Sequence, residues 1–260
     1  MFGTTYFIYM GISFALTAVL VYLGKRFLKT DAAHNMAIRI VSIITVLIHI
    51  SPLWVDYLKN GSAEVESVML FPIHPCNVCM WLLVISTVVK RDTVAYRLLS
   101  EFVCIGGTVC GFVGLVFNEN FGNNPTLADW DILKGLLSHS TMILGTIYLG
   151  ASGLVKIRLR GLVSVVSGLL LFVINGALIN GIYTAAGLGE CNSMYLQSPP
   201  FDALPWLTTP VIGVAAIAVT LLFTSVFEKL ATGKKWKEIF TLKNLFDLKP
   251  APAIDGESAE

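Results

Sequence analysis

The sequence predicts an all-α, polytopic membrane protein with seven transmembrane helices. Of its 260 residues, 55% are hydrophobic and only 13% are charged, and the mean hydropathy is +0.74. A soluble domain of this size carries about 25% charged residues. Apolar runs of roughly 20 residues, the length at which a helix crosses a bilayer, recur along nearly the whole chain. The loops between them are short, so we expect no separate soluble domain.

The seven-helix domain is expected to cover residues 1–228. The first span is followed directly by Lys25 and Arg26 and preceded by no basic residue, which indicates an uncleaved anchor rather than a signal peptide. The third span is the shortest and opens with Pro72 and Pro75, so its helix should begin just after them. The expected spans are 5–24, 37–57, 71–89, 95–117, 131–150, 160–184 and 206–227.

Small residues mark two spans as packed against other helices. Gly107 and Gly111 in the fourth span form a small-xxx-small pair, which permits close helix contact. The sixth span carries Gly176 and Gly181 and is therefore expected to face neighbouring helices rather than lipid.

The basic residues set the orientation. All Lys and Arg except Lys59 and Lys134 fall on one side of the predicted spans. The positive-inside rule then places the N-terminus outside and the C-terminus in the cytoplasm. After the last span, residues 229–249 mix lysines with apolar side chains, which is typical of a basic amphipathic cytoplasmic segment at the membrane surface, or simply of a positive-inside anchor. Residues 250–260 are expected to be a disordered tail.

Polar side chains converge at one predicted depth. With this orientation, His49, His74 and His139 come from three different spans and all lie in the outer half of the membrane. An ionisable side chain within a span is costly and normally faces the bundle interior or a wet cavity. We therefore expect one outward-opening polar pocket, although a single such histidine or amide is also typical of helix packing. The amides expected at this level are Asn77, Asn118, Asn175 and Asn180.

The chemistry of the pocket centres on Cys76. A thiol becomes nucleophilic as the thiolate, which a nearby base or a helix N-terminus favours. His74 lies two residues away, and His139 is a candidate general base from another span. Backbone amides, or Asn118 or Asn180, are candidates to hold an oxyanion. Acyl transfer through a thioester on Cys76 is therefore chemically coherent.

Other readings of the pocket stay open. Cys76 and Cys79 form a C-x-x-C pair, as in quinone-linked thiol–disulfide oxidoreductases, although Cys191 alone is left for a second outer pair. A non-catalytic lipid-binding protein is a further alternative. The histidines show no short-range metal-ligand motif, so we expect neither a metal nor a cofactor, and nothing indicates nucleic-acid binding. Glu101 is expected to pair locally with Arg97, one helical turn away.

Three stretches resemble a known family. The run FPIHPCN at residues 71–77 resembles the "proline, apolar, His, any, Cys" signature of the YwaF-like integral membrane proteins, which are bacterial relatives of the animal transmembrane protein 164 family. Residues 137–140, LSHS, and residues 191–196, CNSMYL, followed by Pro199, are similar to two further family motifs. Ser193 departs from the pattern, which favours an aromatic residue there.

The resemblance implies a cysteine-dependent acyltransferase that acts on lysophospholipids. Cys76 would accept the acyl group, with His74 and His139 as polar partners, and Asn192 and Tyr195 would line the substrate pocket. Pro75 and Cys79 are not expected from the family pattern. The partners would be membrane lipids: a lysophospholipid acceptor and an acyl-donor lipid, in a bacterial cytoplasmic membrane. An outward site favours a phospholipid donor, because coenzyme A thioesters are cytoplasmic.

Overall fold

A computed structural model of the chain describes residues 3–61, 72–118, 121, 126–201 and 204–247, without the side chains of Asp56 and Asn60. The described part is 75% helical and contains no strand, which confirms the all-α class. Within the described residues, six helical segments are long and apolar enough to cross a membrane. These are α1 (Thr4–Phe27), α2 (Asp31–His49), the continuous α6 (Val94–Phe102), η1 (Val103–Gly107) and α7 (Thr108–Val116), α9 (Trp130–Ala151), α10 (Gly161–Ala186) and α11 (Thr209–Thr232).

The third expected span is a shorter helix than the sequence suggested. Helix α5 (Pro75–Ser86) has 12 residues and a length of about 18 Å, against about 30 Å for the hydrocarbon core of a bilayer. It begins at Pro75, as the two prolines predicted. Part of the expected span, residue 71, lies outside the described residues.

The second expected span, 37–57, is wrong in its bounds. Helix α2 starts at Asp31, where the Thr30 side chain accepts a hydrogen bond from the Ala33 N–H at 3.2 Å. It ends at His49, and the separate helix α3 (Pro52–Asn60) follows. Pro52 has no N–H to continue the ladder of α2 and instead takes the first position of a new helix.

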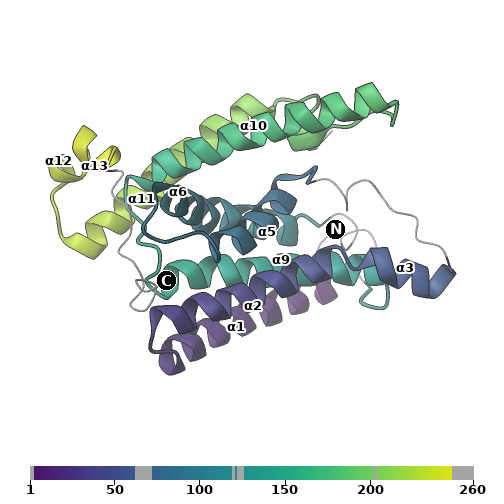
Figure 1. Ribbon diagram of the computed structural model, residues 1–260, viewed down its shortest axis with the longest axis horizontal. Helices are drawn as coiled ribbons and strands as arrows, with labels where there is room; N and C mark the ends of the chain where they lie inside the picture. Colours follow the sequence, from purple (N-terminus) through teal and green to yellow (C-terminus); the bar gives the residue numbers. More distant parts are fainter. Residues whose placement is uncertain (1–2, 62–71, 119–120, 122–125, 202–203, 248–260) are drawn as a thin grey trace.

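The helices form three layers (Figure 1). Helices α1 and α2 lie along one side, α10 and α11 along the other, and α5, α6 and α9 lie between them. Helix α9 packs against α1, α2 and α7, whereas α10 packs against α6 and α11. The short α5 is therefore enclosed by longer helices, in contact with α2, α6, α7 and α9.

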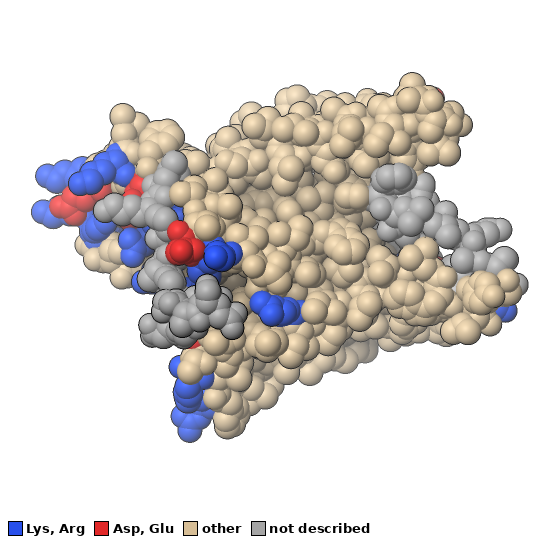
Figure 2. Space-filling model, in the orientation of Figure 1, with Lys and Arg blue, Asp and Glu red and all other residues tan. Residues whose placement is uncertain are grey.

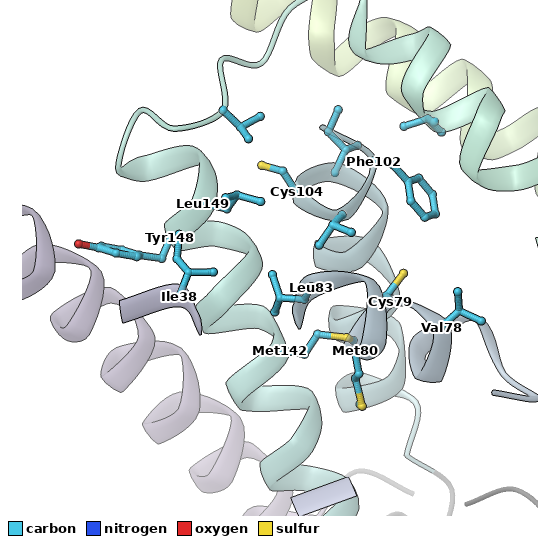
Figure 3. Packing of buried hydrophobic residues seen from close by; sticks show 14 of the residues in the cluster. Ile38, Val78, Cys79, Met80, Leu83, Phe102, Cys104, Met142, Tyr148 and Leu149 are labelled. Atoms are coloured by element: carbon cyan, nitrogen blue, oxygen red, sulfur yellow. The ribbon is translucent and has the colours of Figure 1, made fainter. Parts of the chain in front are cut away.

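Glycines bring the central helices close together. A Cβ at Gly107 would lie 2.9 Å from Thr146 Cγ2, and one at Gly111 would lie 2.8 Å from Ile143 Cγ1, so the small-xxx-small pair packs on α9 as predicted. On α10, Gly176 also packs closely, whereas a Cβ at Gly181 would meet no atom within 4 Å. Figure 3 shows the resulting core, where side chains from α5, α6 and α9 interlock.

Charged side chains gather at one end of the bundle. In Figure 2, most visible Lys, Arg, Asp and Glu residues lie at the end of the bundle that carries α12 (Trp236–Ile239) and α13 (Leu242–Leu245), and few lie along the rest of this face. Helix α3 lies at the opposite end (Figure 1). Among the described residues, the visible basic side chains are thus concentrated at one end of the bundle.

Buried ion pairs close the charged end. Glu101 pairs with Arg160 at 3.0 Å and accepts a hydrogen bond from Ser164 at 2.7 Å, so the expected local pair with Arg97 is wrong. Arg97 instead donates to the backbone carbonyl of Asp247. Glu101 pairs with residues distant in sequence because α6 and α10 pack against each other.

The segment after α11 folds back onto the bundle rather than forming one helix. Glu228 is fully buried and accepts hydrogen bonds from the Leu159 N–H at 2.8 Å and the Asn244 amide at 2.9 Å. Ile239 is also fully buried, while Trp236 and neighbouring lysines stay exposed. The basic and apolar residues of this segment therefore form two short helices, of which α12 packs against α11 and α13 against α10.

Replacing Gly168 with Ala should destabilise the bundle. A Cβ at Gly168 would lie 2.1 Å from the ring of Phe102, which is buried between α6 and α10. Overpacking of this kind costs about 1–3 kcal/mol, so we expect a lower melting temperature in detergent. Gly181→Ala on the same helix is the matched control and should leave melting unchanged, and equal melting of both variants would contradict the packing described above.

Candidate functional site

The site is built around the start of α5. His74 is the N-cap residue in extended conformation (ψ 151°), and Pro75 takes the first helical position. This follows from the local sequence, because a residue before proline avoids the α-region and proline is preset for a helix start. The order His-Pro-Cys-Asn therefore puts Cys76 and Asn77 in the first turn of a helix.

A loop after α10 fixes the residues that precede α5. The Ile73 carbonyl accepts hydrogen bonds from the Met194 N–H at 2.9 Å and the Ser193 hydroxyl at 3.1 Å. Met194 and Tyr195 adopt left-handed φ angles of 54° and 56°, in the short 3₁₀ helix η2 (Ser193–Tyr195). This strained turn brings the Tyr195 ring onto the His74 ring, with centroids 5.6 Å apart and planes inclined by 29°.

Three of the amides predicted to line the pocket form hydrogen bonds within the protein instead. Asn175 donates to the Pro72 carbonyl at 2.9 Å, and Asn180 accepts the Ser193 N–H at 2.8 Å. Asn192 closes its own turn through hydrogen bonds with Ser198. These amides position η2 and the start of α5, so their observed contacts are structural.

Asn118 also has protein partners. Its side-chain oxygen accepts the Phe121 N–H at 3.0 Å, and its amide nitrogen lies 3.1 Å from where a Cβ of Gly135 would stand. It therefore lies against α9, one turn before His139. Its hydrogen bond thus links it to Phe121, while its amide nitrogen packs against α9 at Gly135.

Cys76 and Asn77 are joined directly. The Cys76 thiol donates to the Asn77 side-chain oxygen, with 3.3 Å between sulfur and oxygen. The Asn77 backbone N–H donates to the His74 carbonyl at 3.0 Å, which closes the first turn of α5. Among the described residues, the Asn77 amide nitrogen is buried and has no hydrogen-bond partner.

His139 presents one nitrogen as an acceptor. Its Nδ1–H donates to the Gly135 carbonyl at 2.7 Å, because a carbonyl can only accept. In the neutral ring Nε2 then carries the lone pair; it is buried and meets no partner in the described structure. Gly114 on α7 makes room for the ring, since a Cβ there would lie only 2.2 Å from Nε2.

Helix α7 links Cys76 to His139. The Cys76 thiol interacts with that of Cys110, and Cys110 lies four residues before Gly114. Residues four apart share one helix face at a separation of about 6 Å. Cys110 and Gly114 therefore lie on one face of α7, about one turn apart, and the His139 ring packs against this face at Gly114.

The three predicted histidines lie near one another. His49, at the end of α2, is within electrostatic range of both His74 and His139, and His139 is within range of His74. The described residues thus place histidines from three segments of the chain in one region. They contain no group of three His, Cys, Asp or Glu side chains arranged to hold a metal ion.

Three buried polar atoms in this region have no partner among the described residues: Nδ1 of His74, the amide nitrogen of Asn77 and Nε2 of His139. An unpaired buried polar group costs about 1–3 kcal/mol, and such groups are rare enough to need an explanation. The imidazole nitrogens can accept a proton, and the amide nitrogen can donate a hydrogen bond to an oxygen. Attack of a thiol on a carbonyl requires both functions.

Two residues of the site escaped the sequence reasoning. The sequence predicted no role for either Cys110 or Gly114. The available signal was spacing, because Gly107, Gly111 and Gly114 repeat on the α7 face that meets α9.

A surface hollow lies beside the site rather than in it. It has a volume of about 410 Å³ and opens at the end of α10. Two residues of its lining, Tyr183 and Cys191, pack in one cluster with Ile73, the residue before His74. The residues around the hollow are Tyr183, Thr184, Gly187, Gly189, Glu190, Cys191 and Gln197.

Comparison with known proteins supports the resemblance seen in the motifs. No curated protein and no solved structure matches the chain. A family model, described as the TMEM164 family, matches residues 1–227, which includes α5, α7, α9 and η2. A multi-pass helical bundle with these motifs in this order, matched over most of its length, belongs to the TMEM164 family.

Proposed function

We propose that this protein is a membrane-embedded, cysteine-dependent acyltransferase that moves fatty acyl groups between phospholipids. The observation that carries the proposal is the cluster of three unpartnered buried polar atoms, from His74, Asn77 and His139, around the start of the helix that bears Cys76. A thiol at a helix N-terminus suits nucleophilic attack on an ester when an unprotonated imidazole nitrogen takes its proton.

The reaction has two balanced steps. Cys76 attacks the acyl ester of a donor phospholipid, which releases a lysophospholipid alcohol and leaves an acyl thioester on the sulfur. The hydroxyl of an acceptor lysophospholipid then attacks the thioester and restores the free thiol. In each step Nε2 of His139 takes a proton from the attacking group and returns it to the leaving group. The thiol must first turn away from Asn77, because its resting hydrogen bond goes there.

His74 and Tyr195 form one wall of the proposed site. Their stacked rings lie where the chain enters α5, and the flat apolar faces suit contact with a lipid chain near the reacting ester. His49 adds a third imidazole within electrostatic range. We assign these three residues to substrate positioning.

The proposed topology has seven membrane-crossing segments, counting α5 with its flanking chain. The charged end around α12 and α13 faces the cytoplasm of a bacterial cell, and α3 faces outward (Figure 2). The start of α5 neighbours η2, which follows the end of α10 remote from Arg160. The site then opens to the outer leaflet, where phospholipids rather than coenzyme A thioesters are available as donors.

One observation favours a second candidate, a thiol–disulfide oxidoreductase. The Cys79 thiol interacts with the thiol of Cys110 across α5 and α7. A redox pair in this fold would thus be Cys79–Cys110 rather than the Cys76–Cys79 pair suggested by the sequence. All five cysteines carry free thiols in the structure.

Cys76→Ser should abolish acyl transfer between labelled phospholipids, because a hydroxyl is a far weaker nucleophile than a thiolate. Cys79→Ser should retain activity within about threefold. Intact-protein mass spectrometry should show a fatty-acyl adduct on Cys76 that hydroxylamine removes. A loss of about 2 Da that a reductant restores would instead identify a disulfide enzyme. A free Cys76 with no adduct would favour a lipid-binding role.

Gly114→Ala should lower the transfer rate about 100-fold, because the new methyl group would displace the His139 ring and misplacement of about 1 Å has this effect. Gly11→Ala in α1 is the control, since its Cβ would meet no atom within 4 Å. Wild-type activity in Gly114→Ala would contradict the role of His139 as the base of the reaction.

The orientation is testable by labelling intact cells with a membrane-impermeant maleimide. Leu58 on α3 is 79% exposed and Leu242 on α13 is 77% exposed, so a cysteine at either position is reachable from its own side. Leu58→Cys should be labelled from outside and Leu242→Cys only after cell lysis, with the unmodified protein as background. The reverse pattern would invert the topology.

A further inference from the structure

Asn77 differs from the other predicted amides in having a buried nitrogen with no hydrogen-bond partner among the described residues. Its side chain is only 3% exposed, its oxygen accepts the Cys76 S–H, and its nitrogen meets no partner in the described part of the chain. Asn118 and Asn180, the amides that the sequence suggested for an oxyanion, are engaged by backbone N–H groups.

The hydrogen bond between Cys76 and Asn77 suits a thiol that has not yet lost its proton. A neutral thiol donates a hydrogen and needs an acceptor, which the amide oxygen supplies. Once the proton leaves, that oxygen would face a negative charge, whereas the unused nitrogen has two hydrogens to donate. A half-turn about the Cβ–Cγ bond of Asn77 exchanges the positions of the amide oxygen and nitrogen. The rotated group fits the same space, because the two atoms are nearly equal in size.

We infer that Asn77 is a catalytic residue whose amide nitrogen, with the backbone N–H of Cys76, holds the oxyanion formed when Cys76 attacks an acyl carbonyl. The inference rests on the proposed function and assigns a role at the same site. Both donors lie in the first turn of α5, a 12-residue helix whose N-terminus favours negative charge. Pro75 has no N–H, so the N–H of Cys76 is the first backbone donor that the helix offers.

The step balances without any added reactant. As the S–C bond forms, the electron pair of the carbonyl moves to oxygen, and the thiol proton passes to Nε2 of His139. The Asn77 amide and the Cys76 N–H donate to the resulting oxyanion. Collapse restores the carbonyl and expels the lipid alkoxide, which takes the proton back from His139.

The first experiment compares Asn77→Asp with Asn77→Ala. Aspartate keeps the oxygen that accepts the S–H but loses the donor, whereas alanine loses both. We expect the rate of acyl–Cys76 formation, read by intact-protein mass spectrometry, to fall about 100-fold in both variants. If Asn77 only positioned the thiol, Asn77→Asp would keep nearly the wild-type rate, and that result would overturn the inference.

The second experiment tests the same donors without acyl transfer. A long-chain fatty aldehyde adds to a thiol as a hemithioacetal, whose oxygen occupies the oxyanion position, and this protects Cys76 from maleimide. Asn77→Asp should need about tenfold more aldehyde for equal protection, with the maleimide rate in the absence of aldehyde changed less than about threefold. Equal protection in both proteins, or none in the wild type, would overturn the inference.

The two experiments separate the inference from the proposed function. Aldehyde protection that depends on Asn77, in a protein that never forms an acyl adduct with phospholipids, would support the oxyanion site and refute the lipid acyl transfer. An acyl adduct that forms equally fast in Asn77→Asp and in the wild type would support the lipid acyl transfer and refute the oxyanion site.

Discussion

The fold depends on how the two ends of α5 are satisfied. A helix of about 18 Å inside a bilayer leaves backbone groups at both ends that water cannot reach, and each costs several kcal/mol if unpaired. At the start, the Asn77 N–H donates to the His74 carbonyl at 3.0 Å, and the carbonyls of Pro72 and Ile73, just before the helix, accept hydrogen bonds from α10 and η2. At the other end, the Thr87 carbonyl accepts from Asn35 at 3.0 Å and Arg39 at 2.6 Å, both on α2. Side chains of the two outer layers thus hold the middle one.

This arrangement explains why the proposed site lies where it does. Because η2 fastens the chain just before His74, the first turn of α5 is fixed relative to α10, while its other faces meet α7 and α9. The proposed nucleophile and the proposed base therefore come from helices that differ in their neighbours, and the glycine face of α7 makes room for the His139 ring. A longer third helix would have moved its N-terminus, and with it Cys76, toward the membrane surface.

The sequence was informative where local rules decide the outcome. Pro75 fixed the start of α5, and the spacing of Gly107 and Gly111 identified the face that meets α9. It failed where the partner is far along the chain. Nothing near Asn175 indicates that its amide donates to Pro72, 103 residues away, so it was assigned to the substrate. Likewise, a neighbour one turn away suggested the wrong partner for Glu101, which packing supplied instead from Arg160.

The unpartnered atoms of the site are consistent with this division of roles. Amides that stabilise the protein, such as Asn180, have each found a backbone partner, because an unpaired group inside a bundle is costly. His139 uses only Nδ1 for the protein, in a hydrogen bond to its own helix, and this contact fixes which ring nitrogen carries the lone pair. Asn77 uses only its oxygen. Each side chain is thus held in place by one atom and leaves the other for a ligand, which is how a rigid site can be kept ready in the absence of substrate.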